Sequence, residues 1–508
     1  MLRINRRNFI KTLGLGTVSA FVPGCFNIAA NDKHKDCCAV SPIHSKANQD
    51  SRPNVLFIFA DDWGWGDLSC HGHPYVKTPN IDRLAKEGTD FTRFTVANGV
   101  CSPSRAAVMT GQFPARYIIN GHFAWVQDNE RRNMPDWLSP NAPLLPGFLK
   151  DSGYATAHYG KWHLSNNMIP DSPLPLEYGY DEYGAFNCAG EQMPPHEDAR
   201  LANKFIKKCH KEGKPFFINL WMHESHTPFH TLPKYRWRFP ELEEADNIYA
   251  SVLSHADDRI GEVLHTLDKL GIADNTLVIF SSDNGPARAS KPTGLELGYD
   301  SATGAGYGIG ASKGVTGGRK GYKGCLFEGG IGVPFIVRWP GKIKAGAVND
   351  ASLISAVDLL PTFCQIAGAN LPQDYQPDGI SQVDALLGKN ITAERVKPLF
   401  WKMEAPWPPR ADKPDHWVAY ATVYKNWKLV SNEDGSYVEL YDTEDTYEKN
   451  DLKTQNPEVV EELMKKIESW KTTLPSKPDP ACLSDYRDKP RIDDSQLGCG
   501  VHPKSERK

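Results

Sequence analysis

Short apolar runs alternate along the chain with segments of helical periodicity. Residues 54–60 form a continuous apolar run that ends at Asp61, as expected of a strand buried on both faces of a parallel sheet. Further runs of this kind cover residues 154–159, 215–222, 276–282 and 333–339. Between two of them, apolar residues recur three or four positions apart, on one helical face: Tyr249, Val252, Leu253, Ile260, Val263, Leu264 and Leu267. This alternation predicts a wound α/β sheet with helices on both sides.

The pattern changes after about residue 394. Residues 420–431 and 437–446 alternate as antiparallel strands with one solvent face do, and residues 457–470 have the spacing of one amphipathic helix. We therefore expect a large α/β domain over residues 53–393, followed over 394–508 by a smaller α+β subdomain, with an antiparallel sheet, and a tail. The glycine-rich stretch 303–324 is predicted to be a long active-site loop.

The N-terminus has the pattern of an export signal, expected over residues 1–30. A basic start precedes an apolar run at residues 13–22 that is too short to span a bilayer. The pair Arg6-Arg7 favours a twin-arginine signal over a general secretory one. Cys25 lies in a sequence similar to a lipoprotein cleavage box, and residues 31–52 form a polar tether. These features predict a periplasmic or cell-surface bacterial protein, with Cys25 as a candidate lipid anchor to the membrane.

Composition excludes several other classes of protein. The 508 residues are 40% hydrophobic and 24% charged, and the net charge of −4 provides no basic field for nucleic acid. The eleven cysteines show neither a CxxC pair nor zinc-type spacing, which argues against a thiolate metal cluster. Cys482 and Cys499 bracket a loop-like tail and could form a disulfide.

Polar side chains follow four of the apolar runs, where ligands bind in open α/β sheets. Asp61-Asp62 follows the first run and Asp283-Asn284 the run at 276–282. Either pair alone is common turn chemistry, but two all-oxygen clusters at strand ends indicate a hard divalent cation. Ca²⁺ is favoured over Mg²⁺ because a cage of carboxylate and amide oxygens suits its looser geometry.

Basic and histidine residues follow the other two runs. Lys161 and His163 lie two positions apart on an extended segment, so both side chains face the same way. Together with His226 and Lys323 they would form a cationic pocket for a tetrahedral oxyanion, although each alone is more often a surface or core residue.

Cys101, in the stretch VANGVCSPSRAAVMTG, has four readings: core filler, disulfide half, nucleophile or precursor of another group. A helix start and nearby cations are expected to lower its thiol pKa from ~8.5. Arg105 is too near for the loop of a cysteine phosphatase, which places its arginine six positions after the cysteine. The residues alone thus indicate an anion-ester hydrolase with a hard metal and an unusual nucleophile.

The stretch CSPSRAAVMTG resembles the C-x-P-S-R-x-x-x-x-T-G signature of type I sulfatases, members of the alkaline phosphatase superfamily. The motifs DDWGWGD, GKWHL, HTP, SSDNG and KGCLFEGGIGVP also resemble that family, over about residues 53–400. The resemblance implies a large, mixed, mostly parallel sheet of alkaline-phosphatase type. It also implies that Cys101, tagged by Pro103 and Arg105, is oxidised by a maturation enzyme to formylglycine, whose hydrated aldehyde is the nucleophile.

The resemblance implies roles for the other candidate residues. Asp61, Asp62, Asp283 and Asn284 would bind Ca²⁺, with Asp283 also accepting a proton. Arg105 and Lys161 would hold the formylglycine oxygens. Lys323 and His226 would contact the sulfate ester, with His226 protonating the leaving alkoxide, and His163 would assist release of sulfate. Gly332, where the family often has arginine, is a departure expected to touch no catalytic group.

The expected activity is hydrolysis of sulfate esters, most simply those of an extracellular polysaccharide or its oligosaccharides. Two alternatives stay open at this point: a phosphonate or phosphodiester hydrolase of the same superfamily, and a binding protein without catalysis. Segments 179–198, 286–320 and 402–417 are the candidates for substrate specificity.

Overall fold

The computed structural model describes residues 52–289, 294–300, 304–389, 395–404 and 418–490. The predicted export signal with Cys25, all of the tether except Arg52, most of segment 402–417, and Cys499 lie outside these residues. The predicted domain limit at 393 falls in another such stretch. Those expectations therefore stay predictions.

The five apolar runs form strands of one eight-stranded sheet, which confirms the predicted fold class. In chain order they are β1 (Asn54–Ala60), β4 (Ala155–Lys161), β6 (Phe216–Trp221), β7 (Thr276–Ser282) and β10 (Phe335–Arg338). The strand order is β11-β2-β10-β7-β1-β6-β4-β5. β1 pairs in parallel with both β6 and β7, and β4 pairs in parallel with β6 and β5 (Glu182–Phe186).

β10 makes the sheet mixed. It runs antiparallel to β7 on one side and to β2 (Thr89–Phe91) on the other, and β11 (Ala347–Asn349) completes that edge. An apolar run buried on both faces predicts a central strand but carries no sign of its direction. The direction of β10 is therefore a structural finding.

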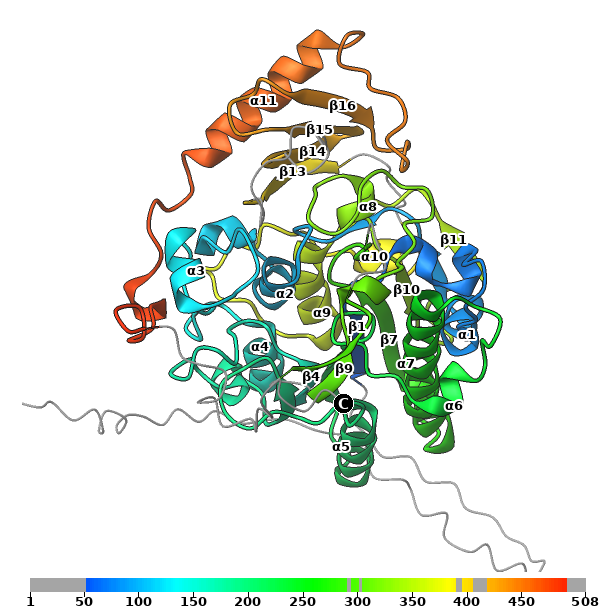
Figure 1. Cartoon of the computed structure of the whole chain (residues 1–508). Helices are drawn as coiled ribbons and strands as arrows, with labels where there is room; N and C mark the ends of the chain where they lie inside the picture. The colour runs from blue at the N-terminus through cyan, green and yellow to red at the C-terminus, as the bar shows by residue number, and fades with distance from the viewer. Residues whose placement is uncertain (1–51, 290–293, 301–303, 390–394, 405–417, 491–508) are drawn as a thin grey trace, which may run out of the picture. The chain divides into compact units, whose positions relative to one another are not determined.

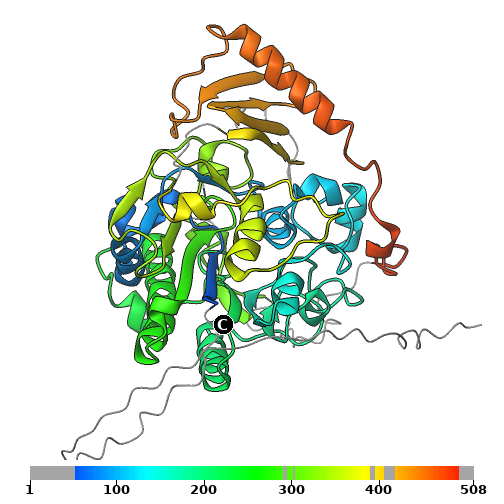
Figure 2. The same cartoon turned by 180° about the vertical axis from the view of Figure 1, so that it is seen from behind.

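Alternate residues of β1 enter two separate cores, one on each face of the sheet. Val55, Phe57 and Phe59 lie in the first core, and Leu56 and Ile58 lie in the second. The helices α2 (Cys101–Thr110), α4 (Leu145–Asp151) and α9 (Leu359–Ala367) cover the first face. The second face is covered by α1 (Pro79–Glu87), α5 (Asp198–Glu212) and α7 (Glu244–Lys269) (Figures 1 and 2). α7 contains the predicted helix.

The remaining short elements lie in the connections between these strands and helices. They are β3 (Phe94–Thr95), α3 (Val126–Arg131), α6 (Pro233–Arg236), β8 (Leu297–Asp300), β9 (Gly304–Tyr307), α8 (Glu328–Ile331), β12 (Ile354–Ser355) and α10 (Val383–Leu386).

A four-stranded antiparallel sheet and one helix follow in the C-terminal part, as predicted. The strands are β13 (Arg395–Lys402), β14 (Tyr420–Lys425), β15 (Trp427–Ser431) and β16 (Val438–Asp442), and the helix is α11 (Pro457–Lys471). The expected solvent face is wrong for β14 and β15, which are almost entirely buried, whereas β16 has partly exposed as well as buried residues. α11 packs on β14, and from β13 the Trp401 indole donates a hydrogen bond to the Val96 carbonyl of the α/β part (2.7 Å).

In the part of the chain that the structure describes, no helix is both long and apolar enough to cross a membrane. The seven cysteines within it form no disulfide with one another.

Candidate active site

The four predicted polar clusters meet at one edge of the sheet. β7, β1, β6 and β4 are consecutive in the strand order and parallel, so their carboxyl ends lie side by side. Asp283 follows β7, Asp61 follows β1, His223 follows β6, and Lys161 ends β4. The carboxyl ends of adjacent parallel strands thus bring together residues more than 200 positions apart in the sequence.

Three carboxylates form the centre of this group. Oxygens of Asp61, Asp62 and Asp283 lie within 4.8 Å of one another, and all three residues are buried. Asn284 is tied to them, because its Nδ2 donates to Asp62 Oδ1 at 2.7 Å. The Asp62 main-chain N–H donates to Asp283 Oδ1 at 3.2 Å, which links the turn after β1 to the turn after β7.

The oxygen atoms of this cluster fit a divalent metal ion. Asp61 Oδ1 and Asn284 Oδ1 are buried and accept no hydrogen bond from the described residues. Buried polar atoms are normally paired, so two orphaned oxygens beside three carboxylates need an explanation. Hard oxygen donors of this kind are the ligands that Ca²⁺ and Mg²⁺ take in proteins.

Three cations surround the carboxylates. Lys161 Nζ lies 2.7 Å from Asp61 Oδ2, and Lys323 Nζ lies 2.6 Å from Asp62 Oδ1. The Arg105 guanidinium donates two hydrogen bonds to Asp283 Oδ2 and a third to the Lys161 carbonyl. It also lies over the Trp221 ring, 5.0 Å from its centroid. Each carboxylate therefore has one cation at hydrogen-bond distance, and Arg105 Nη2 also lies 3.7 Å from Asp61 Oδ1.

Burial and these cations set the pKa values of the carboxyl groups. Burial alone would raise the pKa of Asp61, but the Lys161 ammonium, with His226, His223 and Arg105, holds it well below its usual value. Burial outweighs Arg105 at Asp283 and raises the pKa of that carboxyl to about 6. It also raises the pKa of Asp62 in spite of Lys323.

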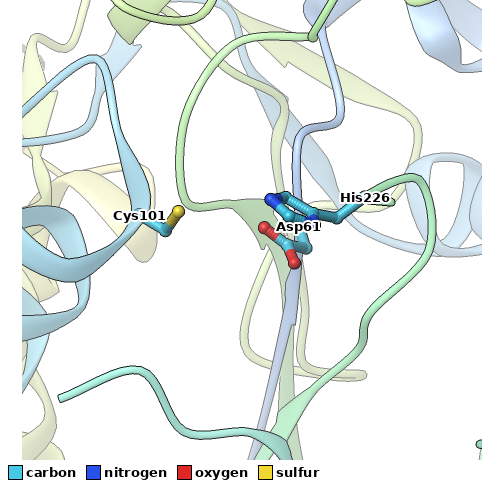
Figure 3. A group of neighbouring side chains, drawn as sticks. All are labelled: Asp61, Cys101 and His226. Atoms are coloured by element: carbon cyan, nitrogen blue, oxygen red, sulfur yellow. The ribbon is translucent and has the colours of Figure 1, made fainter. Parts of the chain in front are cut away.

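Cys101 and His226 face the carboxylate cluster from opposite sides. Cys101 is the first residue of α2, and its Sγ, a carboxylate oxygen of Asp61 and a ring nitrogen of His226 lie within 4.8 Å of one another. Figure 3 shows the Cys101 thiol directed toward the Asp61 carboxylate and the His226 ring. The predicted nucleophile position and the predicted acid thus border one space.

The Cys101 thiol is a poor nucleophile in this setting. Burial raises its pKa, and the nearby Lys161 and Lys323 oppose this only in part. The expectation of a lowered thiol pKa is therefore wrong: the desolvation of a site with 2% exposure outweighs the cations. A protonated thiol at this position fits a precursor better than a working thiolate.

The surroundings of His226 favour its neutral imidazole form. Burial, together with the ammonium groups of Lys161 and Lys323, holds its pKa well below the usual value. Its Nδ1–H donates to the Thr227 carbonyl at 2.6 Å, so Nε2 carries the free lone pair.

His163 lies near Lys161. Among the described residues, it forms no hydrogen bond to the other candidate side chains of the site. Its Nε2–H donates to the Phe123 carbonyl at 3.0 Å, and its Nδ1 is buried without a partner. Burial and Lys161 hold the pKa of His163 well below its usual value. The Phe123 main-chain N–H in turn donates to Ser102 Oγ, beside Cys101.

The loop that carries Lys323 is fixed by close main-chain contact with the start of α2. Any Cβ at Gly99 would lie 2.3 Å from the Cys325 carbonyl oxygen, so only glycine permits this approach. The Gly324 N–H donates to the Gly99 carbonyl at 2.8 Å. The predicted loop 303–324 therefore contributes Lys323 from its last residues. Earlier in the segment lies strand β9.

Sequence reasoning missed one histidine of the site. His223 Nδ1 lies 3.7 Å from Asp61 Oδ2, and its Nε2–H donates to the Pro228 carbonyl. The position of His223 just after the apolar run of β6 could have indicated that it belongs to the site. Gly332, by contrast, lies against Glu328 and Arg319, so the departure from the family pattern touches none of the candidate residues.

Comparisons with known proteins agree with this geometry. The sulfatase family model matches residues 53–369, and the model of the N-sulphoglucosamine sulphohydrolase C-terminal region matches residues 320–473. The N-acetylgalactosamine-6-sulfatase of Sus scrofa is 33% identical over 386 residues, which cover 69% of this chain and 68% of the relative. The N-acetylgalactosamine-6-O-sulfatase of Bacteroides thetaiotaomicron is 27% identical over 83% of this chain and 93% of its own length.

A solved structure extends the match to 85% of the chain. The crystal structure of Ps i-CgsB in complex with k-i-k-neocarrahexaose has a TM-score of 0.69 and 25% identity, and the match covers 85% of this chain and 96% of that one. Together with the family model, which matches more than half of the chain, these similarities show that the protein belongs to the sulfatase family of the alkaline phosphatase superfamily and is a sulfuric ester hydrolase.

Proposed function

We propose that the protein hydrolyses sulfate esters of carbohydrates with a formylglycine made from Cys101 and a Ca²⁺ ion held by Asp61, Asp62, Asp283 and Asn284. The observation that carries the proposal is the approach of Cys101, His226 and Asp61 to within 4.8 Å. It brings together the tagged cysteine, a proton carrier and a carboxylate of the oxygen cluster.

The metal ion would supply Lewis acidity toward the sulfate oxygens and toward a nucleophile at position 101. Three carboxylates and one amide oxygen would be its protein ligands, and Asp61 Oδ1 and Asn284 Oδ1, which accept no hydrogen bond from the described residues, favour this assignment. Lys161, Lys323 and Arg105 already balance the three carboxylates, so the ion adds the positive charge that an anionic substrate needs.

The thiol of Cys101 stands where the oxygens of formylglycine would lie. Hydration of the aldehyde would supply an oxygen nucleophile in place of a buried thiol. The charges of Lys161 and Lys323 oppose, in part, the burial that raises the pKa of the group at this position. Arg105 holds Asp283 and the Lys161 carbonyl, and it thereby orients both sides of the cluster.

His226 is placed to act on the leaving group, because it borders the space beside residue 101. Burial and the ammonium groups of Lys161 and Lys323 lower the pKa of His226 in the free enzyme, and a bound sulfate ester would bring negative charge next to both lysines. The imidazolium form is then favoured and can donate its proton to the departing alkoxide. His163, with a free Nδ1 near Lys161, is the proposed base for the second half of the reaction.

We propose that the substrate is a sulfated sugar with a 6-sulfate, of the N-acetylgalactosamine type. Two relatives with different coverage of the chain are both N-acetylgalactosamine-6-sulfatases, which supports this choice. The export signal, the lipid anchor at Cys25 and the cytoplasmic maturation enzyme belong to the same proposal, since an extracellular glycan requires an exported enzyme.

Sulfate release from a defined panel tests the function. Ion chromatography would measure free sulfate after incubation with N-acetylgalactosamine 6-sulfate, N-acetylgalactosamine 4-sulfate, glucosamine 6-sulfate and an aryl phosphodiester. Release from the first sugar at the highest kcat/KM is the expected result. Release from another sulfated sugar would correct the substrate alone, and turnover of the phosphodiester alone would refute the sulfatase reaction.

A further inference from the structure

The segment that carries His226 is a turn with little regular structure of its own. It follows β6, and the His226 main-chain N–H closes it by donating to the His223 carbonyl at 2.9 Å. The Ser225 N–H donates to the Asp61 carbonyl at 3.0 Å, and the Trp63 indole donates to the Glu224 carbonyl. The main chain of residues 223–226 is thus tied to the residues after β1.

The Glu224 side chain points away from that contact into a buried ionic network. Its Oε2 lies 2.5 Å from Arg259 Nη2, and its Oε1 lies 3.2 Å from His196 Nδ1. Arg259, in α7, also reaches Asp198 Oδ1 at 3.1 Å, the first residue of α5. The side chains of Glu224, Arg259 and Asp198 are each 5% exposed or less. One guanidinium therefore joins two helices to the turn before His226.

Burying such a network is costly, because its charges are removed from water. Apolar replacements of buried ion pairs are often as stable, so stability alone does not account for the network. The catalytic turn, residues 223–226, itself belongs to neither a helix nor a strand. A charged anchor that accepts only one arrangement of Glu224 would therefore restrict the direction of His226, two residues further on.

A metal-binding reading of the same cluster is less consistent with the contacts. His196, Glu224 and His255 offer atoms within 4.8 Å of one another, as a transition-metal site would. Arg259, however, already pairs with the Glu224 carboxylate and lies 3.2 Å from His196 Nδ1. A resident cation thus already pairs with the carboxylate that a metal ion would need.

We infer that Arg259 and Glu224 are positioning residues for His226, which they hold in the direction needed to protonate the leaving group. The inference rests on the proposed function, in which His226 is the acid. The two residues touch no reacting atom in this account and act through the turn that they anchor.

The dependence of rate on the leaving group tests this role. Phenol, with a pKa of ~10 like that of tyrosine, needs protonation more than 4-nitrophenol does. With matured wild-type enzyme and the variants Arg259→Met and Glu224→Gln, kcat and KM would be measured for phenyl sulfate and 4-nitrophenyl sulfate. The expected loss of kcat in Arg259→Met is at least about tenfold larger for phenyl sulfate than for 4-nitrophenyl sulfate, with KM changed less than about threefold. Glu224→Gln should also lose more kcat for phenyl sulfate than for 4-nitrophenyl sulfate, with a smaller difference between the two losses.

Asp198→Asn is the matched control, because it breaks the other ion pair of Arg259 but leaves the one to the turn. Its ratio of rates for the two esters should equal that of the wild type. Arg259→Lys, which can restore one ion pair to Glu224, should recover part of the kcat for phenyl sulfate that Arg259→Met loses.

Each result of this experiment bears on one claim. Equal losses for both esters in Arg259→Met and Glu224→Gln would overturn the positioning role while the sulfatase reaction stands. If Arg259→Met does not fold, the ratio in Glu224→Gln decides. Wild-type enzyme that releases no sulfate from either ester or from the sugar panel would refute the proposed function, and this inference with it.

Discussion

Arg105 Nη2 lies 2.6 Å from Asp283 Oδ2, and both side chains are completely buried. The pair connects the helix that begins at Cys101 with the turn after β7, and hence the position of the nucleophile with the oxygen cluster. A single buried ion pair thus couples the two halves of the candidate site.

Arg105→Ala is expected to be destabilising as well as inactivating. It leaves Asp283 buried without its charge partner, and loss of one member of a buried pair costs about 3–5 kcal/mol. Urea unfolding measures that cost. Arg131→Ala, which breaks an exposed pair with Asp128, is the control and should cost no more than about 1 kcal/mol with full activity. Equal costs for the two variants would contradict the coupling.

Cys101→Ala should give a folded, metal-binding and inactive protein. The substitution removes the precursor of the nucleophile but leaves the carboxylates and their cationic partners in place. Circular dichroism, the Ca²⁺-dependent melting shift and sulfate release measure the three properties. Cys364→Ala, a buried cysteine in α9, is the matched control and should keep its activity. Turnover retained by Cys101→Ala would show that the nucleophile has been misassigned.

Removal of the metal ion should lower the thermal stability of the wild type. A ligand that binds only the folded state stabilises it by about 2.7 kcal/mol at a hundred times its Kd. Melting after EGTA treatment, and after return of Ca²⁺ or Mg²⁺, measures the shift, with Ca²⁺ expected to be more effective.

Asn284→Ala tests the same site through the unpaired amide oxygen and should lose most of the Ca²⁺ shift. Asp378→Asn, at a buried carboxylate outside the oxygen cluster, should keep it. A full Ca²⁺ shift in Asn284→Ala would place the ion elsewhere.

Glu448 predicts a pH dependence of stability in the C-terminal part. Burial raises its pKa to about 7, against the opposing charge of Lys428 at 2.8 Å. Between pH 4.5 and 7, Glu448 in the folded state therefore keeps a proton that it has already released in the unfolded state. The free energy of unfolding should therefore fall as pH rises through this window, by up to about 3 kcal/mol from this group.

Glu448→Gln should make that fall smaller, because the amide cannot ionise. Urea unfolding at several pH values between 4.5 and 7.5 measures the difference between variant and wild type. The exposed Glu462→Gln is the control and should leave the slope unchanged. A wild-type slope in Glu448→Gln would contradict the raised pKa.

Much of the site could be predicted because its residues directly follow apolar runs. Asp61, Lys161 and Asp283 each lie at the end of such a run, and parallel pairing of the strands brings them together. The sulfatase signature around Cys101 and the motif with Lys323 completed the set through resemblance to a known family.

The remainder depends on tertiary packing, which leaves no local pattern. His196, Glu224 and Arg259 meet because α5 packs on α7 beside the end of β6, and nothing in their spacing indicates it. The burial of β14 and β15 also depends on tertiary packing and could not be predicted from the local alternation of polar and apolar residues. Lys428 on β15 is polar, yet it lies buried between Glu328 and Glu448, where ion pairs replace the solvent. The export signal and the domain limits stay predictions.

The identity of residue 101 in an active preparation tests the central claim most directly. The enzyme, produced with a maturation system and shown to release sulfate, would be digested, and the mass of the peptide containing residue 101 measured. The account predicts an aldehyde at this position that reacts with a hydrazide probe. An active preparation in which residue 101 is entirely an unmodified thiol would contradict it.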